Sequence, residues 1–263
     1  MSKQRSKICL VTGSSRGIGR EIALNLANEG HTIIVTYNNN KEKAQSVVNQ
    51  IVENNGNALL SKLNVINRNS IKNTIKKTIS NYGRLDILVN NAGILVQNNF
   101  LDILEKEWDE VFSVNVKGVF NCCQIAIPEL IKHENSRIIN IASFAGKYGG
   151  PKAPHYSASK AAVICLTKSL ARIYSKHRLL VNAVAPGVIE TEMFLHSSKS
   201  SATMGIEVES STPKAVKTIE SDILLGRIGS VEEVANVVAF LASDKSNYIT
   251  GSTIDVNGGL LLS

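Results

Sequence analysis

The sequence predicts an α/β fold, a doubly wound parallel sheet of about seven strands with helices on both faces. Short apolar runs alternate with longer amphipathic segments along the 263 residues, and this order implies parallel strands joined by right-handed crossovers. The runs are apolar almost throughout, as expected of strands that helices cover on both sides. No linker-like stretch divides the chain, so residues 1–263 are expected to form a single domain.

Seven runs have strand character, and most of the segments between them have helical spacing. Residues 192–225 interrupt this rhythm after the sixth run and are rich in Ser and Thr. Either this segment is a surface loop, or it is a lid over a substrate pocket, because ligands of doubly wound sheets bind beyond the carboxyl ends of the strands. The expected strands are residues 8–12, 32–37, 58–64, 87–91, 137–142, 179–185 and 253–256, and the clearest helical segments are 21–29, 41–53, 71–82 and 156–174.

Composition argues against a disordered, a collagen-like or a membrane-spanning chain. Hydrophobic residues make up 43% and charged residues 19% of the chain, which is ordinary for a globular protein. No apolar stretch approaches the ~20 residues that span a bilayer, and the basic N-terminus has no apolar run typical of a signal peptide. We therefore expect a soluble, cytoplasmic protein.

The charged residues, cysteines and histidines indicate neither a nucleic-acid partner nor a metal ion. The net charge of +7 is spread along the chain without a basic run, so a solvated surface or an anionic ligand explains it better than nucleic acid. The four cysteines form no C-x-x-C pair and are expected to be reduced thiols. The five histidines show no metal-ligand spacing, so no metal is predicted.

A glycine-rich loop follows the first expected strand. Residues 12–19 read TGSSRGIG, and an amphipathic helical segment comes next. Glycine permits a tight strand-to-helix turn and a close approach of the backbone to phosphate. The N-terminus of the following helix offers free N–H groups and the positive end of its dipole to a pyrophosphate. In this position the loop indicates a dinucleotide site, whereas the same glycines elsewhere would indicate only a turn.

The end of the second expected strand favours NADP (NADPH) over NAD. An NAD site usually has an acidic residue there that accepts a hydrogen bond from the ribose 2′-hydroxyl. Residues 35–40 contain neither Asp nor Glu, so no carboxylate would repel a 2′-phosphate. Arg16, inside the glycine loop, could bind that phosphate with a charge-assisted fork, although it could also be an ordinary surface residue.

Tyr156 and Lys160 form a candidate acid–base pair. They are four residues apart in a helical segment, so both side chains project from one face. A free phenol has a pKa near about 10, and a neighbouring ammonium or an oxidised nicotinamide would lower it. Such a phenol can exchange a proton with an oxygen while hydride moves at carbon. Taken alone, a Tyr/Lys pair is more often part of a solvated helix surface.

Several motifs together resemble those of the short-chain dehydrogenase/reductase family. The loop at residues 12–19 resembles the family's T-G-x-x-x-G-x-G, residues 90–93 its N-N-A-G, and Tyr156 with Lys160 its Y-x-x-x-K. The resemblance extends from Lys7 to about Gly259 and includes a Pro-Gly pair followed by Thr191. It implies a Rossmann-like fold and a nicotinamide dinucleotide cofactor.

The resemblance also implies roles for individual residues. Tyr156 would donate the proton in reduction, and Lys160 would lower the pKa of Tyr156 and hold the nicotinamide ribose. Ser143 would bind the substrate oxygen, and Asn115 would position a water that relays protons through Lys160. The expected cofactor-binding residues are Gly13, Ser15, Arg16, Gly17, Ile18, Gly19, Tyr37, Asn38, Asn64, Val65, Asn91, Ala92, Gly93, Tyr156, Lys160, Pro186, Gly187, Val188 and Thr191.

Three features depart from the family's pattern. Asn64 stands where the family usually has an aspartate near the adenine, and its amide can still make hydrogen bonds there. His155 precedes Tyr156, where relatives often have a small or amide residue. It is either a substrate contact or an incidental loop residue. The segment 192–225 is longer than in close relatives, which bears on the substrate more than on the chemistry.

Further phrases resemble the branch of the family that reduces β-ketoacyl groups on acyl carrier protein. They include residues 84–93, 137–140, 181–187 and 248–259. This implies reduction of a 3-oxoacyl thioester, carried by an acidic partner that suits a basic chain. It also implies a homotetramer with residues 102–133 and 156–174 in one interface and residues 255–262 in the other.

Two alternatives stay open at this point. The same phrases occur in reductases of sugars, steroids and small ketones, so another carbonyl substrate is compatible with them. A non-catalytic dinucleotide-binding regulatory module is the alternative of a different class. The complete set of Asn115, Ser143, Tyr156 and Lys160 argues against such a module, because binding alone needs no tuned phenol.

Overall fold

The computed structural model of the chain describes residues 6–191 and 213–262, and within them seven strands form one sheet. The strand order is β3-β2-β1-β4-β5-β6-β7, and every neighbouring pair is parallel. This confirms the predicted α/β class and overlaps every predicted strand. The strands are β1 Ile8–Val11, β2 Thr32–Tyr37, β3 Asn57–Lys62, β4 Ile87–Asn90, β5 Arg137–Ile141, β6 Leu180–Pro186 and β7 Thr253–Val256.

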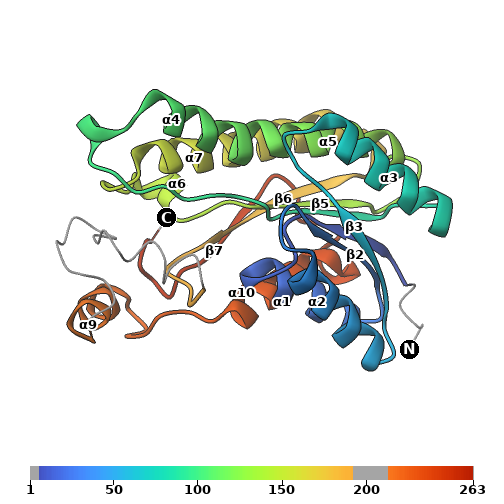
Figure 1. Ribbon diagram of the computed structural model, residues 1–263, viewed down its shortest axis with the longest axis horizontal. Coiled ribbons are helices and arrows are strands. Elements are labelled where there is room, and N and C mark those ends of the chain that lie inside the picture. The colour runs from blue at the N-terminus through green and yellow to red at the C-terminus, as the bar shows by residue number, and fades with distance from the viewer. Residues whose placement is uncertain (1–5, 192–212, 263) are drawn as a thin grey trace.

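Helices cover both faces of this sheet, as predicted. In Figure 1, α3, α5 and α7 lie on one face and α1, α2 and α10 on the other. Among the described residues, no helix is long and apolar enough to cross a membrane. The helices are α1 Gly17–Asn28, α2 Lys41–Glu53, α3 Arg68–Tyr82, α4 Glu105–Phe112, α5 Gly118–Leu130, α6 Ala145–Tyr148, α7 Pro154–Tyr174, α9 Pro213–Asp222 and α10 Val231–Ala242, with short segments η1 Phe100–Asp102, η2 Ser113–Lys117, η3 Ser175–His177 and η4 Asp244–Ser246.

Alternate residues of each central strand belong to two different cores. Leu10 of β1 packs in the cluster with the helices α3, α5 and α7, whereas its neighbours Cys9 and Val11 pack with α1, α2 and α10. All three side chains are fully buried. Because both faces are covered, such strands are apolar at every position, which is the pattern seen in the sequence.

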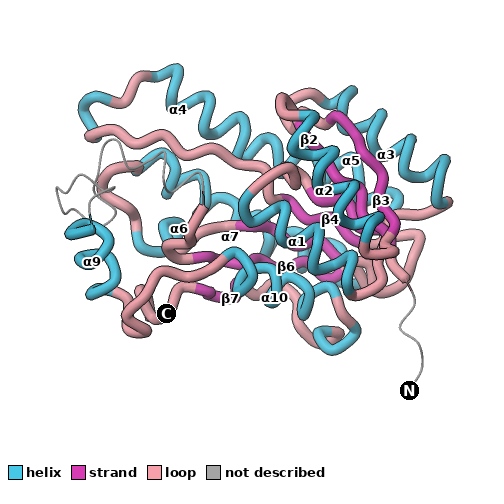
Figure 2. Tube along the Cα trace, turned by 60° about the horizontal axis from the view of Figure 1, so that its bottom comes forward, coloured by secondary structure: helices cyan, strands magenta, loops and turns pink. Residues whose placement is uncertain are grey.

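The strand order places a candidate ligand crevice at one edge of the sheet. β1 pairs with both β2 and β4, so the chain winds outward in opposite directions from this point. Ligands of doubly wound sheets bind at such a point of reversal, beyond the carboxyl ends of the strands. In the two views of Figures 1 and 2, α9 lies at the end of the molecule opposite to the N-terminus.

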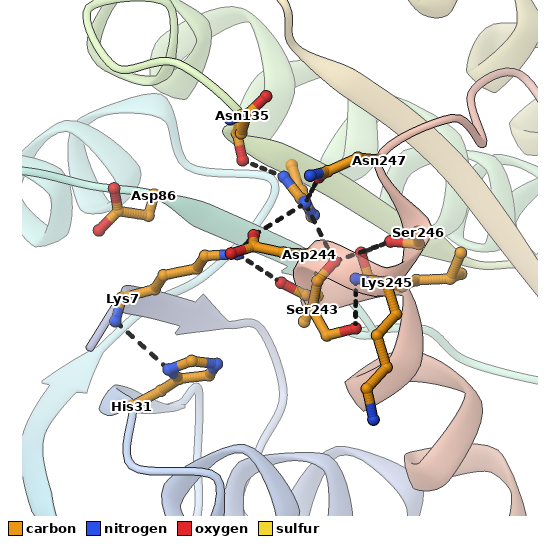
Figure 3. A network of polar contacts seen from close by, with 12 residues as sticks. Lys7, His31, Asp86, Asn135, Ser243, Asp244, Lys245, Ser246 and Asn247 are labelled. Carbon is orange, nitrogen blue, oxygen red and sulfur yellow. Dashed lines mark hydrogen bonds and ion pairs between the residues drawn. The ribbon is translucent and has the colours of Figure 1, made fainter. Parts of the chain in front are cut away.

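The other edge of the sheet, at the amino ends of the strands, holds a network of charged and polar groups around the buried Arg137 (Figure 3). Arg137 begins β5, is only 1% exposed, and donates to Ser243 O at 3.0 Å. Lys7 Nζ donates to Ala242 O at 2.8 Å and pairs with Asp244 at 3.0 Å. Both cations thus bind carbonyl groups at the C-terminal end of α10, where the helix dipole favours positive charge.

We predict that Arg137→Ala lowers the free energy of unfolding by about 3 kcal/mol, because it removes a fully buried side chain and leaves the carbonyl groups of Asn135 and Ser243 without their donor. Denaturant unfolding measures this loss. The matched control is Lys132→Ala, which removes an exposed ion pair with Glu129 and is expected to cost less than about 0.5 kcal/mol. Equal losses for the two variants would contradict a structural role for this network.

Candidate active site

The glycine loop between β1 and α1 forms a tight turn at the carboxyl edge of the sheet. Gly13 and Gly17 have positive φ angles of 64° and 52°, a conformation that favours glycine. A Cβ atom added to Gly13 would lie 3.1 Å from Cα of Ala92. The loop therefore packs closely against the segment that follows β4, and a side chain at Gly13 would push the two apart.

Asn91 joins these two segments through hydrogen bonds. Its Nδ2 donates to Thr12 O at 2.9 Å and to Gly13 O at 3.0 Å. The backbone N–H groups of Asn91 and Ala92 donate to Thr12 Oγ1 at 2.9 and 3.0 Å. A Cβ atom on Gly19 would lie only 2.3 Å from Asn91 Nδ2. Two of the sequence motifs thus form one hydrogen-bonded unit at the point where the sheet changes direction.

The N-terminus of α1 fits an anionic group. α1 begins at Gly17, and its N-cap residue, Arg16, makes no capping hydrogen bond with its side chain. The N–H groups of the first turn and the positive end of the helix dipole suit a pyrophosphate. Thr191 lies beside the same turn, since a Cβ atom on Gly17 would be 3.7 Å from its Cγ2. The loop, the helix start and Thr191 thus lie together in what we call the glycine cradle.

The residues expected near the adenine follow β2 and β3. Tyr37 ends β2 and is half-buried, and Asn38 is exposed. The Oδ1 atom of Asn64 accepts a hydrogen bond from the N–H group of Ile66 at 3.1 Å. An aspartate would accept the same bond, so Asn64 preserves this turn despite its departure from the family pattern. Val65 is buried and packs tightly against the start of α5.

Tyr156, Lys160 and Ser143 meet at the carboxyl edge, beside β5. The Lys160 ammonium lies 5.6 Å from the centre of the Tyr156 ring and donates to Ile141 O at 2.8 Å. Ser143 follows β5 and makes a side-chain hydrogen bond with Tyr156. Lys160 is 5% exposed and Ser143 is 7% exposed. The spacing in the sequence therefore brings together the expected proton donor, its lysine and the expected oxygen-binding serine.

Asn115 completes this group from an unusual helical turn. It lies in η2, a π-helical segment between α4 and α5, and is 1% exposed. Its Oδ1 accepts from Ile94 N at 2.9 Å, while its Nδ2 donates to Ile94 O at 2.9 Å and to Ser159 Oγ at 3.0 Å. A Cβ atom on Gly93 would lie 3.2 Å from Asn115 Oδ1 and 3.5 Å from Lys160 Nζ. The fourth member of the expected set therefore borders the same space as Lys160.

Burial shifts the pKa of both members of the Tyr156/Lys160 pair. It lowers the pKa of Lys160 to about 8. Burial raises the pKa of Tyr156 above its ordinary value, and the hydrogen bond with Ser143 lowers it only in part. Burial therefore dominates the pKa of Tyr156 in the chain alone, and the lowering of that pKa by Lys160 stays a prediction. The phenol keeps its proton at neutral pH, as a proton donor must.

The segment after β6 borders the same site. Pro186 O accepts a hydrogen bond from Phe144 N at 2.9 Å, and Gly187 packs against Asn257 so closely that a Cβ atom would lie 2.7 Å from Cα of that residue. Val188 is buried and belongs to a small apolar cluster that Tyr156 contacts. The segment Pro186–Val188 thus lies beside the apolar cluster that Tyr156 contacts, and its contact with nicotinamide stays a prediction.

α9 packs on this apolar cluster. Its Ile219, together with Ile223 just beyond its end, is buried against Phe144, Val188 and Leu260. Within the expected lid at residues 192–225, residues 192–212 lie outside the described residues. The described remainder of that segment includes α9, whose Ile219 belongs to the same apolar cluster that Tyr156 contacts.

The structure corrects both alternatives for His155. The residue is not in a loop, because it lies in α7, and it is 0% exposed, so it presents no surface to a ligand. Neither ring nitrogen has a hydrogen-bond partner among the described residues. Burial lowers the pKa of His155, and the charge of Glu107 opposes this shift.

Sequence reasoning missed the groups that hold the candidate catalytic side chains in place. Ile141 and Ile94 act through backbone atoms, which every residue has, so no side-chain pattern could reveal them. Ser159 accepts from Asn115 and donates to Tyr156 O at 2.7 Å. The position of Ser159, one residue before Lys160, is the signal in the sequence that could have indicated its role. The π-helical turn of η2 could not be predicted either, because the α-helical spacing of apolar residues does not reveal it.

These features define a dinucleotide-dependent oxidoreductase. They are a doubly wound sheet, a glycine cradle where the winding reverses at β1, and a Tyr/Lys/Ser/Asn group beside that cradle. A family profile described as "Enoyl-(Acyl carrier protein) reductase" matches residues 13–261. The 3-oxoacyl-[acyl-carrier-protein] reductase FabG of Staphylococcus aureus is 43% identical over 257 residues, which cover 98% of this chain and 99% of that protein. FabG of Thermotoga maritima is 43% identical over 256 residues, covering 97% and 98% of the two chains.

A solved structure agrees with these sequence matches. A dehydrogenase/reductase from Sinorhizobium meliloti superposes with a TM-score of 0.88 at 33% identity, covering 99% of this chain and 98% of that one. The chain belongs to the short-chain dehydrogenase/reductase family, as its motifs indicate.

We predict that His155→Gln makes stability less sensitive to acid. The lowered pKa means that the folded chain stays neutral at His155 while the unfolded chain takes up a proton below its ordinary pKa of 6.5. Stability is therefore complete above that pH and is lost as pH falls toward the folded-state pKa. Denaturant unfolding between about pH 5 and 8 should show a shallower fall for the variant than for the wild type. Parallel curves would contradict a buried neutral imidazole.

Proposed function

We propose that the chain reduces a 3-oxoacyl thioester on acyl carrier protein to the 3-hydroxyacyl product, with NADPH as reductant. The observation that carries this proposal is the convergence of Tyr156, Lys160, Ser143 and Asn115 beside the glycine cradle. Relatives that cover nearly the whole chain and carry the name of 3-oxoacyl-[acyl-carrier-protein] reductase support the substrate class.

The residues divide the reaction between them. A bound nicotinamide would supply the hydride that the carbonyl carbon of the substrate accepts. Tyr156 donates its proton to the carbonyl oxygen, and Ser143 donates a hydrogen bond to the same oxygen as negative charge develops there. Lys160, whose pKa of about 8 keeps it mostly charged at neutral pH, stabilises the phenolate that Tyr156 leaves behind. Asn115 positions the water that returns a proton through Lys160.

The cofactor lies, in this proposal, from the glycine loop to Val188. The N–H groups of Gly17, Ile18 and Gly19 would bind the pyrophosphate, and Asn91 to Gly93 would line the nicotinamide ribose. Arg16 is exposed at the start of α1, where its guanidinium can reach a 2′-phosphate. Asn38, exposed just after β2, adds no negative charge that would oppose it.

α9 forms, in this proposal, one wall of the acyl site. The apolar cluster of Phe144, Val188, Ile219 and Ile223 lies against Tyr156 and suits the hydrocarbon part of an acyl thioester. The net charge of +7 suits an acidic carrier. We also propose that the chain works as a cytoplasmic homotetramer, supported by the exposed Trp108, Phe120 and Ile173 on the helices expected in one interface.

Turnover of defined substrates tests this function. Wild type should consume NADPH with an acetoacetyl thioester faster than with a sugar, a steroid or a simple ketone, and a crotonyl thioester separates carbonyl from enoyl reduction. Tyr156→Phe should lose at least about 99% of turnover while its affinity for NADPH stays within about twofold, because only the acidic hydroxyl is removed. Full turnover by this variant, or reduction of the crotonyl thioester alone, would refute the proposal.

The choice between NADPH and NADH is tested at Arg16. We predict that Arg16→Ala weakens NADPH binding about tenfold or more, since a charge-assisted hydrogen bond contributes about 1.5–3 kcal/mol. The affinity for NADH should change little, because NADH has no 2′-phosphate. Fluorescence titration with both dinucleotides measures the difference. An equal loss for NADPH and NADH would show that Arg16 does not recognise the phosphate.

A further inference from the structure

A chain of side-chain hydrogen bonds crosses the core below the candidate active site. Asn90 Nδ2 donates to Asn140 Oδ1 at 2.8 Å, and Asn140 Nδ2 donates to Thr167 Oγ1 at 2.9 Å. Thr167 Oγ1 donates in turn to Val163 O at 2.8 Å. The exposed fractions of Asn90, Asn140 and Thr167 are 3%, 0% and 0%. These bonds connect β4, β5 and α7 inside an otherwise apolar core.

Burying polar side chains in an apolar core costs free energy of hydration. We therefore expect this network to have a role, namely to specify one geometry. Asn140 lies among Ile138, Ile139 and Ile141, and β5 is buried throughout, so an apolar side chain would suit its position. Buried amides must keep their hydrogen bonds, because an unpaired one loses its hydration without compensation. None of these side chains belongs to the group expected to touch substrate or cofactor. Their bonds instead favour one position of α7 against β5.

The network is adjacent to the contact that holds Lys160. Asn140 immediately precedes Ile141, whose carbonyl accepts the hydrogen bond from Lys160 Nζ at 2.8 Å. Thr167 is seven residues after Lys160, about two helical turns along the same face of α7. α7 therefore has two polar contacts with β5, about 10 Å apart along the helix axis. Apolar packing alone would let the helix slide or rotate, whereas two polar contacts fix both motions.

We propose that the hydrogen bond between Asn140 and Thr167 is a positioning contact that sets where α7 presents Tyr156 and Lys160. The proposal rests on the reaction proposed above, to which it adds two residues that touch neither substrate nor cofactor. The bond acts through the backbone of β5 and the axis of α7. Its loss therefore displaces the acid–base pair without altering the glycine cradle.

The test replaces the hydroxyl of Thr167 by a methyl group of nearly the same size. Thr167→Val should lower kcat about tenfold, because a misplacement of about 1 Å can cost up to about a hundredfold. Its affinity for NADPH should stay within about twofold. Thr78→Val is the matched control, since Thr78 is equally buried and donates to its own helix at Thr74 O at 2.9 Å, far from the site. The control should keep kcat.

Thr167→Ser separates positioning from packing. It restores the hydroxyl but removes a buried methyl group, so it should regain most of the lost kcat even where its melting temperature is below that of Thr167→Val. A role in packing alone predicts the opposite order, with valine the more active. That order, or a Thr167→Val variant no less active than Thr78→Val, overturns the proposal.

A readout without turnover keeps this test separate from the proposed function. NMR titration of 13C-labelled lysine should show Lys160 titrating near pH 8 in the wild type and in Thr78→Val. Thr167→Val should move that pKa by more than about half a unit, because the surroundings of Nζ change, and Thr167→Ser should restore it. An unchanged titration in Thr167→Val overturns the positioning role, even if the chain reduces none of the substrates tested.

Discussion

The hydrogen bond from Lys160 Nζ to Ile141 O is the interaction on which the candidate active site depends. It places an ammonium group inside the protein, where burial lowers its pKa to about 8, and it fixes that group 5.6 Å from the ring of Tyr156. Without a partner, a buried charge of this kind would lose its proton or move to solvent. The carbonyl group at the end of β5 therefore keeps the lysine beside the phenol.

The charged groups that serve stability lie at the amino ends of the strands, whereas the candidate site lies at their carboxyl ends. At the amino edge, Arg137 and Lys7 bind carbonyl groups at the end of α10, and these contacts serve stability. At the carboxyl edge, Asn91 joins the glycine loop to the end of β4, and the side chain of the N-cap residue Arg16 makes no capping hydrogen bond at the start of α1. Loops at this edge meet because parallel strands all end there, so residues far apart in the sequence share one site.

Much of this arrangement could be predicted from the sequence because its signals are local. Apolar runs predict the strands, the spacing of Gly13, Gly17 and Gly19 predicts the cradle, and the i, i+4 spacing predicts that Tyr156 and Lys160 share a helix face. Other features depend on contacts between distant segments, and no local pattern shows them. The burial of His155, the raised pKa of Tyr156 and the bond between Asn140 and Thr167 are of this kind.

The central claim is that Tyr156 keeps its proton in the chain alone and releases it readily beside an oxidised nicotinamide. Ultraviolet difference titration of the wild type against Tyr156→Phe isolates this one phenol among the 6 tyrosines of the chain. The account predicts a pKa above the ordinary value of about 10 without cofactor and a clear fall when NADP⁺ is added. A phenol that titrates identically in both conditions would contradict it.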